Sequence, residues 1–134
     1  MKIKLASVIV QDQASALRFY TEVLGFAKKV DLPAGEYRWL TVVSPEEPDG
    51  TQLLLEPNVN HVASLYQRAL FQSGVPLMAF AVDDIREEVR RLKALGVVFV
   101  SEPTEAGGAV IAVFDDTCGN LIQVYQELVA TPER

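Results

Sequence analysis

Two polar side chains stand at the ends of apolar strands, where they could take part in chemistry. Glu56 ends an apolar run that Pro57 stops, because proline has no N–H to offer a strand ladder. Gln123 lies between Ile122 and Val124 and faces away from both, since successive side chains of a strand alternate. A carboxylate withdrawn from water can serve as a base or pair with a cation, whereas an amide only forms hydrogen bonds. Glu56 is thus either such a group or the solvated end of a strand, and Gln123 is either a ligand contact or a structural side chain.

Histidine and cysteine each occur once. His61 lies in the segment that joins the two halves of the chain and is expected at the surface, with a ligand contact from a lid as the alternative. Cys118 excludes an internal disulfide and a multi-cysteine zinc site, and no neighbouring histidine or basic cluster equips it for thiol catalysis. Four aspartates are expected to cap helices or form turns: Asp83, Asp84, Asp115 and Asp116.

Length and composition limit the classes of function. The 134 residues, 49% apolar and 22% charged, suit one small globular domain. The net charge of −6 is a poor match for nucleic acid or an anionic membrane and favours a neutral or cationic ligand. No apolar run approaches the roughly 20 residues of a membrane span, and the start of the chain is too strand-like for a signal peptide. We expect a cytoplasmic protein that binds a small molecule and has neither nucleic acid nor membrane as a partner.

The apolar pattern predicts the order β-α-β-β-β twice. The expected strands span residues 3–10, 26–32, 37–43 and 52–56 in the first half and 77–82, 97–101, 109–114 and 121–125 in the second. Pro33 and Pro103 are expected in turns that follow strands. The first helix follows Asp12 and presents an apolar stripe, and a short helix in the connection presents another to an apolar surface. These stripes are Ala14, Leu17, Tyr20 and Leu24, and Val62, Leu65, Tyr66 and Ala69.

The two halves match at both ends of their helices. Val10-Gln11-Asp12 corresponds to Val82-Asp83-Asp84, and Leu24-Gly25-Phe26 corresponds to Leu95-Gly96-Val97. An internal duplication explains this match, with module one at 1–57, a connection at 58–74, module two at 75–128 and a frayed tail at 129–134. Each module would be a curved sheet with a helix on one face, and two such sheets would enclose a trough on the other face.

The duplicated pattern resembles the vicinal oxygen chelate superfamily, which includes glyoxalase I, extradiol dioxygenases and the fosfomycin- and bleomycin-resistance proteins. The resemblance covers residues 1–126 and depends on four motifs: Val10-Gln11-Asp12 leading to Phe19-Tyr20, Val23-Leu24-Gly25-Phe26, Phe80-Ala81-Val82-Asp83-Asp84, and Phe114-Asp115-Asp116 with Gly119-Asn120 leading to Ile122. It implies an α+β fold in which two tandem βαβββ modules form a curved mixed-sheet trough with helices on the outer face. It also implies a homodimer.

Metal-dependent members of that superfamily carry His or Glu ligands at positions that correspond here to Leu5, Glu56, Leu77 and Gln123. Leucine has no lone pair, and an amide oxygen is a weak neutral ligand beside a carboxylate. One carboxylate does not hold a catalytic transition metal, which normally has three protein ligands. The resemblance therefore implies a protein without a metal cofactor, and a divalent metal enters only in the alternative function below.

Strand alternation predicts which side chains line the trough. The expected ligand-binding residues are Leu5, Ser7, Trp39, Thr41, Glu56, Leu77, Gln123 and Tyr125. The opposite parity of the third strand would present Arg38 in place of Trp39 and Thr41. The resemblance implies a metal-free protein that binds a small organic ligand. The alternatives are a glyoxalase-type lyase or isomerase that uses Glu56 as its base, with or without a divalent metal, and a dimeric interaction module without catalysis.

Overall fold

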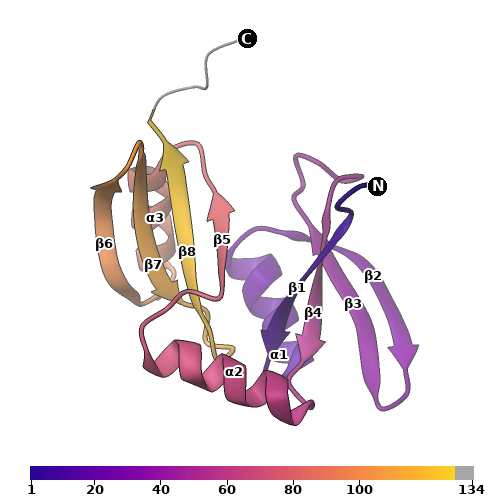
Figure 1. Cartoon of the computed structure of the whole chain (residues 1–134). Coiled ribbons are helices and arrows are strands. Elements are labelled where there is room, and N and C mark those ends of the chain that lie inside the picture. Colours follow the sequence, from indigo (N-terminus) through magenta and orange to yellow (C-terminus); the bar gives the residue numbers. More distant parts are fainter. Residues whose placement is uncertain (129–134) are drawn as a thin grey trace.

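Two four-stranded mixed sheets, one from each half of the chain, form the framework of the protein (Figure 1). The computed structural model describes residues 1–128, so the predicted frayed tail lies outside the described residues. The first half comprises β1 (Leu5–Val10), α1 (Gln13–Arg18), a π-helical turn η1 (Phe19–Val23), β2 (Ala27–Ala34), β3 (Tyr37–Val43) and β4 (Gln52–Pro57). Then follow α2 (His61–Gln72), β5 (Met78–Ala81), α3 (Ile85–Ala94), β6 (Phe99–Ala106), β7 (Ala109–Asp115) and β8 (Leu121–Glu127). The predicted α+β fold of two tandem modules is confirmed.

The two sheets have the same topology, with the orders β1-β4-β3-β2 and β5-β8-β7-β6. In each sheet the first strand pairs in parallel with the last, and the other pairs are antiparallel. Pro33 and Pro103, which the sequence placed in turns, lie inside β2 and β6. Both strands are sheet edges, where the N–H that proline lacks has no ladder partner to lose.

The first helix begins where the sequence predicts but buries a different stripe. The Asp12 carboxylate accepts the N–H of Ser15 at 2.8 Å and caps the helix. Ala14 is exposed, whereas Ala16 and Phe19 are buried beside the predicted Tyr20. After Arg18 the chain widens into the π-helical turn η1, in which the N–H of Leu24 donates to the carbonyl of Phe19 at 3.0 Å.

The connecting helix α2 forms as predicted, but its apolar stripe faces away from the protein. In Figure 1, α2 crosses the lower ends of both sheets. Val62, Leu65, Tyr66 and Ala69 are exposed. The opposite side of the helix carries Gln67, which is buried and donates to the carbonyls of Ile9 at 2.9 Å and Cys118 at 3.2 Å and to Oδ1 of Asn120 at 3.0 Å. The helix is therefore attached to both modules through the polar side chain of Gln67 and not through its apolar stripe.

One hydrophobic core spans both modules. The rings of Phe26 and Phe80 lie 5.1 Å apart between centroids, and the rings of Tyr20 and Phe80 lie 6.4 Å apart. The hydroxyl of Tyr20 donates to Oδ2 of Asp116 at 2.6 Å, and neither side chain is exposed. The two modules thus pack against each other within one chain, through η1 and Phe26 of the first and β5 and the β7–β8 turn of the second.

We predict that Tyr20→Phe lowers the free energy of unfolding by about 1–3 kcal/mol, because it removes one donor from a buried carboxylate. Urea denaturation of both proteins measures the difference. Tyr66→Phe is the matched control, since Tyr66 is exposed, and it should change stability by less than about 0.5 kcal/mol. Equal small effects of the two substitutions would contradict the importance of this hydrogen bond.

Candidate functional site

The predicted residues of module one gather on one face of its sheet, opposite α1. Register pairs Ser7 of β1 with Leu54 of β4, and Leu54 with Thr41 of β3. The alternating neighbours Val8, Leu55 and Leu40 are fully buried. The predicted parity of the third strand therefore agrees with the structure, and Leu5, Ser7, Trp39, Thr41 and Glu56 share what we call the first-sheet face.

Glu56 and Thr41 differ sharply in their surroundings on this face. Glu56 lies opposite Ile9 near the end of β4 and is exposed, so its carboxylate is solvated. Thr41 is fully buried, and its hydroxyl donates to Oε1 of Gln52 at 2.7 Å and accepts the N–H of Val30 at 3.2 Å. Strand alternation did not predict that neighbouring groups would form hydrogen bonds with the Thr41 hydroxyl. Among the predicted polar groups of the first-sheet face, Ser7 and Glu56 are the exposed ones.

Arg38, the alternative to Trp39, is engaged elsewhere. Its Nη2 lies 2.7 Å from Oδ2 of Asp31, and its Nε donates to Oδ1 of the same carboxylate at 3.0 Å. These two hydrogen bonds lower the pKa of Asp31 below its usual value and raise the pKa of Arg38. The guanidinium is thus paired within the protein and is not a free ligand contact.

The predicted residues of module two share the corresponding face of the second sheet. Gln123 is paired with Ala79 of β5 and Val113 of β7, and Tyr125 is paired with Ala81. Leu77, Gln123 and Tyr125, which we call the second-sheet face, are half-buried. Each set is therefore brought together within its own sheet, and the first-sheet face is the more open of the two.

Two apolar side chains of the first-sheet face were not among the residues predicted from the sequence. Leu32 pairs with Trp39 across the β2–β3 hairpin, and Tyr37 has the same parity as Trp39. Leu32, Tyr37, Trp39 and Leu5 expose 58, 40, 43 and 44% of their surfaces. Alternation along residues 37–43 was sufficient to find Tyr37. Finding Leu32 required the hairpin register, which places Ala34 opposite Tyr37 and which composition alone does not specify.

The four positions that correspond to metal ligands divide between the faces, with Leu5 and Glu56 on the first sheet and Leu77 and Gln123 on the second. Two of the four side chains are hydrocarbons, so the donor set does not fit a divalent transition metal. Within residues 1–128, no three His, Cys, Asp or Glu side chains come together as a metal site would require.

The remaining reactive groups lie away from both faces. His61 is the exposed first residue of α2. Cys118 is 2% exposed, and burial raises the pKa of its thiol to about 12. Asp116 was predicted to form a turn and does so, but it is also fully buried and receives the cross-module bond from Tyr20. Burial raises the pKa of Asp116 above its usual value, and the donors around the carboxylate act against that shift.

Three comparisons with known proteins agree with this geometry. The family model described as "Glyoxalase/Bleomycin resistance protein/Dioxygenase superfamily" matches residues 2–124. The protein YurT of Bacillus subtilis (strain 168) is 57% identical over 127 residues, which cover 95% of this chain and 100% of YurT.

Two solved structures extend the comparison. UcmS2 aligns with a TM-score of 0.80 at 30% identity, over 93% of this chain and 97% of its own. TnmS3, an antibiotic binding protein from Streptomyces sp. CB03234, aligns with a TM-score of 0.72 at 30% identity, over 95% and 96% of the two chains. The similarity thus extends over nearly the whole length of both chains.

We predict that the Cys118 thiol of the native protein resists 5,5′-dithiobis(2-nitrobenzoate) at neutral pH, because the thiol is buried and its pKa of about 12 keeps it protonated. In denaturant, the same reagent should release one equivalent of chromophore per chain, since the sequence holds one cysteine. Rapid labelling of the native protein would show that the β7–β8 turn opens readily.

Proposed function

We propose that this chain, which belongs to the Glyoxalase/Bleomycin resistance protein/Dioxygenase superfamily, binds a small organic ligand with an aromatic or apolar body and a cationic group, without a metal. One observation carries the proposal. The first-sheet face exposes Leu5 and Trp39, together with Leu32 and Tyr37, in the same sheet as the solvated carboxylate of Glu56.

The chemistry of this surface matches such a ligand. Aromatic and aliphatic side chains supply contact area for a planar apolar body, and a carboxylate beside them attracts a positive group. The net charge of −6 adds a long-range attraction for cations. The structural neighbour TnmS3 is an antibiotic binding protein, which supports a ligand of organic, drug-like chemistry for this chain.

We further propose that a second copy of the chain completes the site. We also propose that the protein acts in the cytoplasm. The first-sheet face is open, whereas small-molecule sites bury most of the surface of their ligands. A homodimer in which another copy covers this face would supply the missing wall and bury the exposed apolar side chains. None of the helices in residues 1–128 has both the length and the hydropathy of a membrane span.

The lyase or isomerase alternative receives less support from the geometry. A general base of that kind works best when its carboxylate is withdrawn from water, and Glu56 is exposed. The binding proposal needs no such withdrawal, because a solvated carboxylate still attracts a cation.

We predict saturable quenching of the fluorescence of Trp39, the single tryptophan, by the cationic dye proflavine and not by the anionic anthraquinone-2-sulfonate. Glu56→Gln should weaken proflavine binding by about two- to fivefold, the contribution expected of an exposed charge pair. Calorimetric titration measures the affinities. Glu36→Gln, which alters an exposed carboxylate in the β2–β3 turn, is the control and should change nothing. Absence of quenching, or equal weakening by both substitutions, would refute the proposed site.

We predict a particle of twice the 14.7 kDa chain mass in sedimentation equilibrium at micromolar concentration. Leu5→Glu should shift the population towards monomer, because it places a charge in the apolar surface that the second copy would cover. Leu95→Glu, at the exposed end of α3, is the matched control and should leave the mass unchanged. A wild-type protein that sediments as a monomer would remove the dimer proposal and leave the ligand proposal to be judged by the dye titration.

A further inference from the structure

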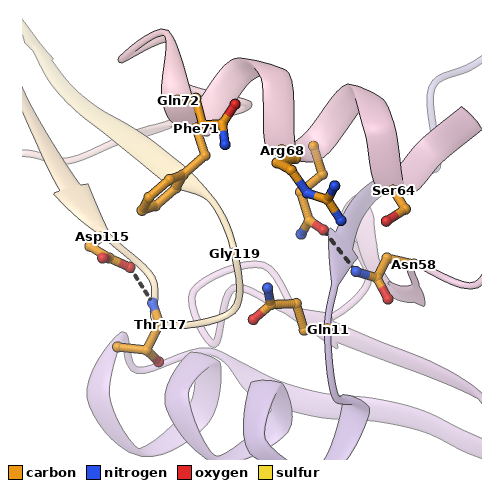
Figure 2. A pocket seen from close by; sticks show the side chains of 10 residues that line it. Gln11, Asn58, Ser64, Arg68, Phe71, Gln72, Asp115, Thr117 and Gly119 are labelled. Carbon is orange, nitrogen blue, oxygen red and sulfur yellow. Dashed lines mark hydrogen bonds between the residues drawn. The ribbon is translucent and has the colours of Figure 1, made fainter.

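A cavity lies between α2 and the β7–β8 turn, away from both sheet faces (Figure 2). It is open to solvent and has a volume of about 440 Å³. Its walls come from four separate segments: Gln11 after β1, Asn58 after β4, Arg68 and Phe71 of α2, and the turn from Asp115 to Gly119. None of the residues of the first-sheet or second-sheet face lines it. The cavity therefore belongs to both modules and is separate from the site proposed above.

Two opposite charges line this cavity without neutralising each other. Arg68 projects from α2, and Asp115 stands on the far wall at the end of β7 (Figure 2). Within residues 1–128, neither side chain takes part in an ion pair. Oδ1 of Asp115 accepts the N–H of Thr117 at 2.7 Å, which leaves the second carboxylate oxygen for another donor. A cation and an anion held apart in this way complement a ligand that carries both charges.

The rest of the cavity wall is neutral and includes one aromatic ring. Phe71 points from α2 toward the turn, between Asp115 and Arg68 in the view of Figure 2, and is 38% exposed. The amide of Gln11 projects into the space below α2 and offers both a donor and an acceptor. These groups suit a ligand with an apolar side chain beside its two charges.

The floor of the cavity is fixed by a close approach of the turn to α2. Gly119 has φ of +102°, which strains any other residue, and a Cβ on it would lie 2.8 Å from Nε2 of Gln67, so a larger residue would also displace that amide. Gln67 is in turn held by its hydrogen bonds to Ile9 and Asn120. Buried hydrogen bonds thus hold α2 and the β7–β8 turn, which carry the opposing walls, in place relative to each other.

We propose that this cavity binds a small zwitterion of the amino-acid type. The ligand's carboxylate would pair with the guanidinium of Arg68, which matches a carboxylate in a two-pronged geometry. Its ammonium would pair with the carboxylate of Asp115, and its side chain would lie against the ring of Phe71. The site would lie where both modules meet α2, next to the hydrogen bonds that join them.

The test is a titration of the uniformly ¹⁵N-labelled protein with L-phenylalanine and two analogues that each lack one charge. Phenethylamine lacks the carboxylate, and 3-phenylpropanoate lacks the ammonium. L-Phenylalanine should shift the amide resonances of Thr117 and Gly119 saturably, and each analogue should bind at least about tenfold more weakly, because a charge-assisted contact is lost.

Two substitutions assign the charges. R68Q should weaken L-phenylalanine and 3-phenylpropanoate about tenfold or more and leave phenethylamine unchanged, while D115N should show the converse pattern. Asparagine retains an acceptor for the Thr117 N–H, so D115N should keep the turn intact. Arg86→Gln, an exposed change on α3, is the control and should have no effect. The proposal would be overturned if L-phenylalanine caused no saturable shift up to about 10 mM, a concentration well above a millimolar dissociation constant. Unchanged affinity in R68Q, or shifts confined to the first-sheet face, would also overturn it.

Discussion

The structure depends on one buried carboxylate. Oδ1 of Asp116 accepts the N–H groups of Cys118 at 2.7 Å and Asn120 at 3.0 Å, and Oδ2 accepts the hydroxyl of Tyr20 at 2.6 Å and Nδ2 of Asn120 at 2.8 Å. An isolated carboxylate without exposed surface would be costly, and these four donors offset that cost. The same atoms fix the β7–β8 turn and join it to the first module, so turn geometry and module pairing share one origin.

Much of the fold follows from local chemistry that a sequence displays. Asp12 and Asp84 mark the starts of α1 and α3, and the recurrence of the apolar pattern predicts two modules with the same strand order. The orientation of α2 could not be predicted in this way. Its exposed stripe has ideal amphipathic spacing, but the side that contacts the protein is chosen by Gln67, whose Nε2 donates to acceptors more than fifty residues away in sequence, in both modules.

The candidate site also has features that the sequence predicts and features that it does not. Alternation predicts correctly which side chains share a sheet face, because the period of two is intrinsic to a strand. It does not predict exposure. Glu56 is solvated and Thr41 is fully buried although both lie on the first-sheet face, because exposure depends on what the neighbouring strands cover. The cavity beneath α2 could not be read from any local pattern, since four segments with unremarkable sequences form it only when the modules meet.

The position of Gln67 gives the connection between the modules a role beyond joining them. Its side chain contacts Ile9 of one module and Asn120 of the other, and Gly119 stays small to admit it. The two modules and the helix between them are therefore coupled by the packing of one side chain. A change at any of these positions in one half would have to be matched in the other half and in the segment between them. The connecting helix is thus a structural part of the contact between the modules and not only a covalent link.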